Sequence, residues 1–299
     1  MTELRIATRR SPLALRQAES VRERLASVGV ASRLVAVETS GDRRLDVPLA
    51  AMGGQGVFAA EVQRAVIAGD ADIAVHSAKD LPSTSPEGLV LACVSERRDP
   101  ADALVGRSLA GLGPGATVAT GSPRRRALLL ERRPDLNVVG LRGNMATRLA
   151  SVGRDGIDAV VAAMAALERL GATDLVAERL DPTWFVPQVG QGALALETRA
   201  ADGAVLEQLE PMNDHDAFAA LSAERAFLAE LGAGCSIPAG ALAHAEGGAL
   251  SIAGVMIGVD GVTSVRATRQ GTDPLAVGAA LARHLRDERH GAELPGWEP

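Results

Sequence analysis

The sequence predicts an α/β protein built from two similar units and followed by a small α+β domain. Short apolar runs alternate with segments whose apolar residues recur at helical spacing, and this order occurs twice. The second occurrence begins after Asp99 and Pro100, and the alternation stops after Pro211. A chain of 299 residues also exceeds what one hydrophobic core usually organises, so we expect two α/β lobes and a smaller third domain.

The first unit is predicted to have the order βαβαβ. Residues 4–7 form an apolar run, and Ser11 followed by Pro12 predicts a helix start, because serine caps a helix and proline suits its first turn. Apolar residues continue at helical spacing to Val28. Strands are then predicted at 34–37 and 73–75, on either side of a helix at 57–67. This order favours a parallel or mixed sheet covered by helices.

The second unit and the third domain follow from the same patterns. In the second unit we predict strands at 117–120, 138–141 and 159–162 and helices at 124–132 and 146–152. In the third domain we predict helices at 216–231 and 274–287 with strands at 239–243, 250–257 and 262–267. Open α/β sheets bind ligands beyond the strand ends, so the two units should face each other across a cleft.

Composition excludes several classes of protein. The net charge of −6 argues against general nucleic-acid affinity, and the longest apolar segments are too short to cross a membrane. The N-terminal residues lack a signal-peptide core, so we expect a cytoplasmic protein. Cys93 and Cys235 are too few for a disulfide framework and lack the neighbours of a metal site, so no metal is expected.

Arginine and small polar residues gather at three predicted strand-to-helix turns. These turns are residues 8–11, 120–126 and 141–148. Arginine forks and the N-terminal end of a helix both attract carboxylates and phosphates, so the three turns together indicate a ligand with many negative groups. In this arginine-rich chain, any one turn could instead be solvated or paired with nearby acids.

Two further positions could carry chemistry. Lys79 is the only lysine in the chain, and it adjoins Asp80 directly after a predicted strand. Asp80 could stabilise a cation that develops during a reaction, or it could merely cap the turn before Pro82. Cys235 lies in a glycine-rich loop, whereas Cys93 lies in an apolar run and should be buried, so Cys235 is the expected reactive thiol.

Seven segments together resemble the porphobilinogen deaminases, which are also called hydroxymethylbilane synthases. In order along the chain, they are residues 5–9, 11–14, 76–80, 121–125, 141–144, 189–192 and 234–235. The resemblance implies two lobes like those of type II periplasmic binding proteins and a third domain that carries a cysteine. It places the domains at residues 1–98 with 193–212, 99–192 and 213–299. Ala51 and Gln55 depart from the family, where lysines are common.

The resemblance also implies a reaction and its residues. Asp80 would be catalytic, in the joining of four porphobilinogen molecules on a dipyrromethane held as a thioether by Cys235. The other cofactor-binding residues implied are Ser77, Lys79, Thr120, Gly121, Ser122, Arg124, Arg125, Arg142 and Gly192. The substrate-binding residues implied are Arg9, Ser11, Arg142, Arg148, Arg169 and Gln191. The enzyme would be a monomer that passes hydroxymethylbilane to uroporphyrinogen III synthase.

Two other functions are compatible with part of the pattern. A non-catalytic anion-binding module would use the same cleft and arginines, and so would a transferase acting on phosphorylated sugars. Neither has a need for Cys235 in a third domain. A covalently bound pair of pyrroles would therefore distinguish the deaminase from both.

Overall fold

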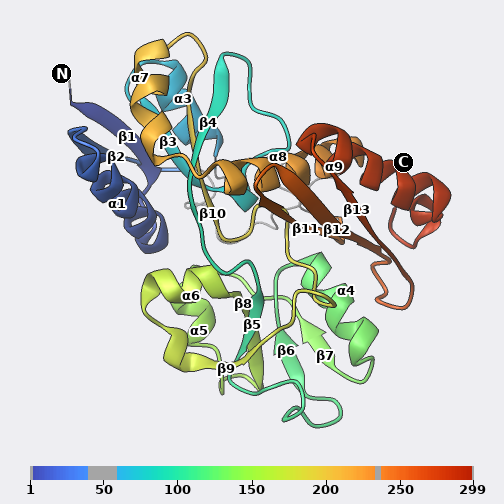
Figure 1. The fold of residues 1–299 in the computed structure, drawn as a ribbon. Helices are drawn as coiled ribbons and strands as arrows, with labels where there is room; N and C mark the ends of the chain where they lie inside the picture. Colours follow the sequence, from blue (N-terminus) through green and yellow to red (C-terminus); the bar gives the residue numbers. More distant parts are fainter. Residues whose placement is uncertain (1–2, 40–58, 233–236, 298–299) are drawn as a thin grey trace.

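The computed structural model describes residues 3–39, 59–232 and 237–297 and contains two α/β lobes and a C-terminal α+β domain (Figure 1). Within these residues, two sheets have five strands each and the third has three. The predicted fold class is therefore confirmed. No helix in the described ranges has both the length and the apolar character needed to cross a membrane.

The first lobe contains a mixed sheet with the strand order β2-β1-β3-β10-β4. Its strands are β1 (Leu4–Arg9), β2 (Ser32–Val37), β3 (Ile73–Ser77), β4 (Leu89–Arg97) and β10 (Ala193–Arg199). Its helices are α1 (Pro12–Ser27), α3 (Ala60–Ile67) and α7 (Gly203–Leu209). β1 runs parallel to β2 and β3, whereas β10 runs antiparallel to β3 and β4. The strand that completes this sheet thus comes from a distant part of the sequence.

Helix α1 begins where the sequence predicts. The Oγ of Ser11 accepts a hydrogen bond from the backbone N–H of Ala14, and Pro12 occupies the first turn. Val21 and Leu25 are buried in the same core as Ile6 of β1. In contrast, α3 begins at Ala60, and the first residues predicted for this helix lie outside the described part of the chain.

The second lobe repeats this arrangement with the order β7-β6-β8-β5-β9. Its strands are β5 (Asp102–Val105), β6 (Thr117–Ala119), β7 (Asn137–Val139), β8 (Ala159–Ala163) and β9 (Val176–Arg179). Its helices are α4 (Pro123–Arg132), α5 (Met145–Leu149) and α6 (Met164–Leu170). β6 is parallel to β7 and β8, and β5 is antiparallel to β8. α1 of the first lobe contacts α6 of the second (Figure 1).

The C-terminal domain packs two helices on one face of an antiparallel sheet. Its elements are α8 (His215–Glu230), β11 (Ala239–Glu246), β12 (Ala249–Ile257), β13 (Ser264–Gly271) and α9 (Pro274–Arg283), which continues as a π-helical turn at His284–Glu288. Phe227 of α8 and Leu281 of α9 are buried together against this sheet. Val255 and Ile257 of β12 belong instead to the core of the second lobe, which fixes the domain against that lobe.

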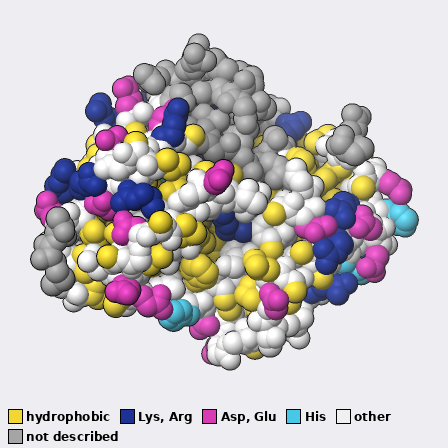
Figure 2. Space-filling view, turned by 90° about the horizontal axis from the view of Figure 1, so that it is seen from above, with side chains coloured by type: hydrophobic (Ala, Val, Ile, Leu, Met, Phe, Trp, Pro, Cys, Tyr) yellow, Lys and Arg dark blue, Asp and Glu magenta, His cyan; other side chains and the backbone are white. Residues whose placement is uncertain are grey.

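Short 3₁₀ turns complete the structure at Ala78–Asp80 (η2), Thr173–Leu175 (η3), Glu210–Met212 (η4) and Gly291–Glu293 (η6). Figure 2 shows acidic and basic side chains interspersed over one face of the molecule, with a hollow near the middle. No broad surface of one charge is visible on that face.

Candidate active site

The turn that carries Lys79 and Asp80 is fixed by its surroundings. β3 ends at Ser77, and η2 follows at once with Ala78 buried beneath it. The side chain of Gln188 donates a hydrogen bond to the carbonyl oxygen of Lys79 at 3.1 Å. Gly190 has a φ of +75° and approaches so closely that a Cβ there would lie 2.8 Å from the carbonyl carbon of Ala78. Residues 188–192, the connecting segment that leads from the second lobe into β10, therefore hold this turn directly.

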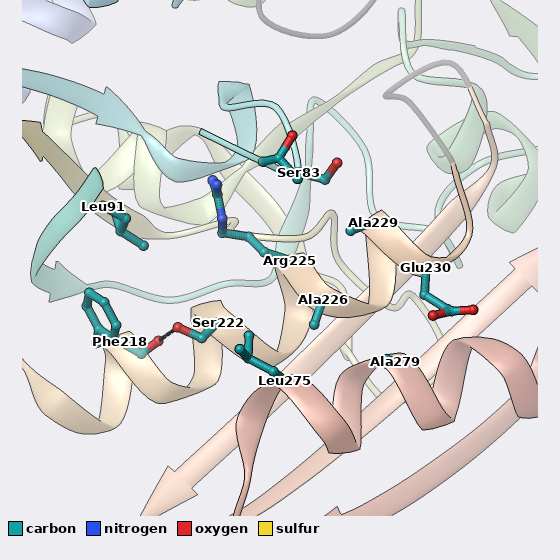
Figure 3. A pocket seen from close by; sticks show the side chains of 11 residues that line it. Ser83, Leu91, Phe218, Ser222, Arg225, Ala226, Ala229, Glu230, Leu275 and Ala279 are labelled. Atoms are coloured by element: carbon teal, nitrogen blue, oxygen red, sulfur yellow. Dashed lines mark hydrogen bonds between the residues drawn. The ribbon is translucent and has the colours of Figure 1, made fainter. Parts of the chain in front are cut away.

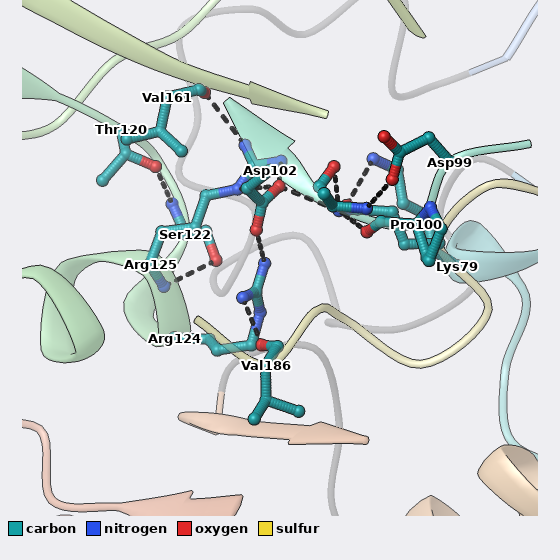
Figure 4. A network of polar contacts seen from close by, with 12 residues as sticks. Lys79, Asp99, Pro100, Asp102, Thr120, Ser122, Arg124, Arg125, Val161 and Val186 are labelled. Atoms are coloured by element: carbon teal, nitrogen blue, oxygen red, sulfur yellow. Dashed lines mark hydrogen bonds and ion pairs between the residues drawn. The ribbon is translucent and has the colours of Figure 1, made fainter. Parts of the chain in front are cut away.

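Asp102 is the centre of a buried polar network (Figure 4). Its Oδ2 accepts a hydrogen bond from Arg124 at 2.7 Å. Its Oδ1 accepts bonds from Arg125 at 2.6 Å and from Gln191 Nε2 at 2.9 Å. The Oε1 of Gln191 in turn lies 3.3 Å from Lys79 Nζ. A continuous chain of hydrogen bonds thus runs from Lys79 in the first lobe, through the connecting segment, to Asp102 and the arginines of the second lobe.

The pKa shifts show that cations are crowded here. Burial, followed by the charge of Arg125, lowers the pKa of Lys79 to about 8, although Asp80 and Asp102 oppose this shift. The pKa of Asp102 lies far below its usual range, because the charges and hydrogen bonds of Arg125 and Arg124 outweigh the effect of burial. Each neighbouring arginine therefore stabilises Asp102 and destabilises the charged form of Lys79.

Arg148 belongs to the same electrostatic cluster. Burial lowers its pKa, Arg125 and Arg142 lower it further, and Asp80 raises it. Its Nε donates to the carbonyl oxygen of Gly143 at 2.9 Å, which ties the side chain to the turn before α5. The structure thus brings Asp80 and the arginines of two predicted turns into one electrostatic environment.

The two arginine turns of the second lobe lie against each other. Ser122 caps α4, where its Oγ accepts a bond from Arg125 N, and the Oγ1 of Thr120 accepts one from Ser122 N. A Cβ on Gly121 would lie 2.7 Å from the carbonyl oxygen of Leu141, so only glycine permits this approach. This contact sets the distance between the turn before α4 and the turn that contains Arg142.

The remaining residues of the sequence prediction lie in several places. Ser11 caps α1, and Ser77 accepts a hydrogen bond from Gln17 at 2.7 Å. Arg9 is the last residue of β1. Arg169 is 6% exposed and donates to Glu96 Oε1 and to the carbonyl oxygen of Gly192, both at 2.9 Å. None of these contacts joins them to the Asp102 network. Cys235, Ala51 and Gln55 lie outside the described residues.

Sequence reasoning missed the acids that hold the arginines. Asp102 and Glu96 sit beside the connecting segment, close to Pro100, and no motif marked them. Acidic residues near the lobe boundary at Pro100 were only a weak signal for partners of the arginines, since acids are common throughout this chain. Arg124 illustrates the consequence, because its Nη atoms already donate to Asp102 and to the carbonyl oxygen of Val186. Arg124 adds charge to the site while its hydrogen bonds serve the fold.

This arrangement suits a polyanionic ligand. Arg125 and Arg124 lower the pKa of Lys79, Arg125 and Arg142 lower that of Arg148, and Asp80 opposes both shifts. Cations that lower one another's pKa in a desolvated site are stabilised when carboxylates bind between them. Within the described ranges, no three His, Cys, Asp or Glu side chains form a group able to hold a metal ion.

Comparisons with known proteins agree with this geometry. Residues 4–207 match the family model described as "Porphobilinogen deaminase, dipyromethane cofactor binding domain", and residues 218–287 match "Porphobilinogen deaminase, C-terminal domain". The chain belongs to the porphobilinogen deaminase family. The resemblance inferred from the seven sequence segments is thereby confirmed, and the cofactor of this family is the dipyrromethane.

Curated porphobilinogen deaminases match almost the whole chain. The relative from Roseiflexus castenholzii is 46% identical over 300 residues, which cover 98% of this chain and 99% of the relative. The relative from Geobacter sulfurreducens is 45% identical over 291 residues, which cover 95% and 92%. Among solved structures, the methionine binding protein MetQ aligns with 75% of this chain and 96% of its own, at 13% identity and a TM-score of 0.44.

A pH-dependent part of the stability should originate at Lys79. Because its folded pKa of about 8 lies below its ordinary value of 10.5, the unfolded chain binds more protons between these pH values. The cost of burying the charge is fully present below about pH 8 and is relieved as the pH rises toward 10.5. Between about pH 8 and 10.5 the free energy of unfolding of the parent protein should therefore rise by up to about 3 kcal/mol, and Lys79→Gln should lack this rise.

Urea unfolding at pH 7, 8.5 and 10 measures this contribution. Lys79→Gln and its parent should both carry Cys235→Ser, so that a bound cofactor does not alter the pKa of Lys79. The exposed Arg107→Gln is the control, and its pH profile should match that of the parent. Identical slopes for Lys79→Gln and its parent would show that the ammonium is not desolvated.

Proposed function

We propose that this chain joins four porphobilinogen molecules head to tail on its primer and then releases them by hydrolysis as hydroxymethylbilane, the linear tetrapyrrole of porphyrin and haem biosynthesis. One observation carries the proposal most directly: in a member of this family, Asp80 lies within a desolvated cluster of cations formed by both lobes. Porphobilinogen carries an acetate and a propionate, so every added unit brings two carboxylates to these cations.

The cations divide into two groups in this proposal. Lys79, Arg125 and the turn at residues 120–122 would hold the carboxylates of the dipyrromethane, with Arg124 contributing charge, Gly192 close approach and Arg142 serving both ligands. Arg9, Arg148 and Arg169 would receive the substrate, together with Ser11 and Gln191. The chain of hydrogen bonds from Lys79 through Gln191 to Asp102 and Arg125 supports a fixed position for Lys79 and Arg125 of the first group.

Asp80 would act through its charge. When the aminomethyl group of porphobilinogen leaves as ammonia, positive charge develops on the pyrrole, and a carboxylate held nearby lowers the energy of that state. The bound dipyrromethane supplies the nucleophilic carbon to which the first substrate is joined. Lys79 and Arg148 are both electrostatically coupled to Asp80, so this carboxyl group belongs to the cation cluster that would surround the substrate.

We further propose the three domains at residues 1–98 with 193–212, 99–192 and 213–299. The pairing of β10 with β3 and β4 supports assigning residues 193–199 to the first lobe. The proposal also includes a cytoplasmic location, a monomeric state and transfer of the product to uroporphyrinogen III synthase. Size-exclusion chromatography with light scattering tests the monomer.

Intact-protein mass spectrometry tests the covalent attachment. The wild-type protein should carry the mass of two pyrrole units, and Cys235→Ser should lack it entirely, because a serine hydroxyl does not form the thioether. Cys93→Ala is a matched control and should keep the added mass. Cys93 is fully buried, and burial raises the pKa of its thiol to about 12, so it is not a competing nucleophile.

The same measurement separates this function from its rivals. An anion-binding module or a transferase of phosphorylated sugars would show the unmodified mass in all three proteins. If Cys235→Ser retained the two pyrrole units, the attachment would lie elsewhere and this part of the proposal would be wrong.

A further inference from the structure

A cavity separate from the candidate active site lies between the first lobe and the C-terminal domain. Its volume is about 590 Å³, and its walls are residues 83–84, Leu91 of β4, and the facing sides of α8 and α9 (Figure 3). No residue that lines it belongs to the candidate active site. The volume falls within the range of roughly 300–1,000 Å³ that is typical of small-molecule sites.

The walls of this cavity differ in character from one part to another. Leu91, Phe218 and Leu275 provide apolar surface, and the alanines of α8 and α9 leave room between the helices (Figure 3). Hydroxyl groups from Ser83 and Thr84 lie on the side of the first lobe. Such a site accommodates an apolar body together with a small polar group.

Arg225 is the basic side chain of this cavity. It extends from α8 toward Ser83 and Leu91 (Figure 3). Its Nη2 makes one long hydrogen bond of 3.4 Å to Ser85 Oγ, and its Nη1 is buried without a partner among the described residues. Burial lowers the pKa of Arg225, with Glu197 opposing the shift. A desolvated guanidinium with an unused donor is unfavourable, and an anion would relieve it.

The surrounding charges restrict the ligand to a single negative group. Glu197 already accepts hydrogen bonds from Ser85 and Gln63, both at 2.7 Å, so its charge is shared. At the other end of the cavity, Glu230 is paired with Arg283 and Arg286. Arg225 therefore remains as the one incompletely compensated charge among the residues that line the cavity.

We propose that this cavity binds a small monocarboxylate with an apolar body, such as a short-chain fatty acid or an aromatic acid. The carboxylate would pair with Arg225 beside Ser83 and Thr84, and the apolar body would pack against Phe218 and Leu275. This site goes beyond the proposed activity. Ser83 and Thr84 of its walls come shortly after Asp80 in the sequence, and α8 belongs to the C-terminal domain. A bound acid would therefore contact both the first lobe and the C-terminal domain.

Calorimetry and saturation-transfer NMR on the holoenzyme test the site, with hexanoate and benzoate as probes. Both acids should bind, and their neutral amides, hexanamide and benzamide, should bind at least tenfold more weakly. Arg225→Gln should weaken hexanoate binding at least tenfold. Ala279→Phe fills the cavity from a partly buried position on α9 without changing charge, and it should abolish binding.

Arg148→Gln is the matched control, since Arg148 is another desolvated arginine but belongs to the active-site cluster. It should leave hexanoate affinity unchanged. If Arg225→Gln does not fold, Ala279→Phe still decides. Three results would overturn the proposal. They are equal binding of acids and amides, undiminished binding to folded Ala279→Phe, and no binding of either acid at about 50 mM, a concentration well above a dissociation constant of about 1 mM.

Discussion

Asp80→Ala is expected to reduce turnover to below about 1% of the wild-type rate, because loss of one group that stabilises transition-state charge typically costs roughly 10²–10³ in rate. The structure gives a physical reason for this large effect. Asp80 acts on both Lys79 and Arg148, and without it the cluster keeps Asp102, whose charge is already shared by Arg124 and Arg125. A positive environment opposes the loss of ammonia.

The measurement is consumption of porphobilinogen by purified protein whose mass shows that the cofactor is attached. Asp80→Glu keeps the charge but displaces the carboxylate, so it should be slower than wild type and clearly faster than Asp80→Ala. Asp174→Ala, in the turn η3, is the control and should retain full activity. A cofactor-loaded Asp80→Ala protein with wild-type activity would exclude the proposed role.

Asp102→Ala is expected to have the largest effect on stability, with a loss of about 3–5 kcal/mol in the free energy of unfolding. The substitution leaves the guanidinium groups of Arg124 and Arg125 buried without their shared carboxylate, and it removes an acceptor of Gln191. Because Gln191 also contacts Lys79, the variant should retain less of the dipyrromethane as well.

Urea unfolding monitored by circular dichroism measures the loss, and intact mass measures the cofactor. Asp99→Ala provides the comparison, since Asp99 forms an ion pair with Arg179, whose side chain is 47% exposed. That partly solvated pair should contribute about 0–1 kcal/mol. Equal losses for the two variants would mean that Asp102 does not compensate buried charge.

Local sequence signals predicted much of the fold. Ser11 with Pro12 marked the start of α1, and Ser11 caps this helix as expected, whereas the cap of α4 by Ser122 was not predicted. The apolar residues of α1 are buried at the predicted spacing, except that Val28 ends the helix and is 39% exposed. Such features depend on neighbours within a few residues, which the sequence contains directly.

Strands that complete each sheet from a distance were harder to predict. β5 is only four residues long and begins two residues after Pro100, and its partners β8 and β9 lie more than 50 residues away in the sequence. β10 likewise joins β3 across more than 100 residues. Their pairing depends on which edges the helices leave open, and no local pattern contains that information.

The sequence by itself determined the alternation of strands and helices, the three arginine turns and the motif that ends in Lys79 and Asp80. These follow from periodicity and from side-chain chemistry at fixed spacing. Only the tertiary structure decided that Asp102 would pair with Arg124 and Arg125, that Gln191 would connect it to Lys79, and that Arg225 would enter a separate cavity. Burial is what makes these charges consequential, and burial arises only when distant segments pack together.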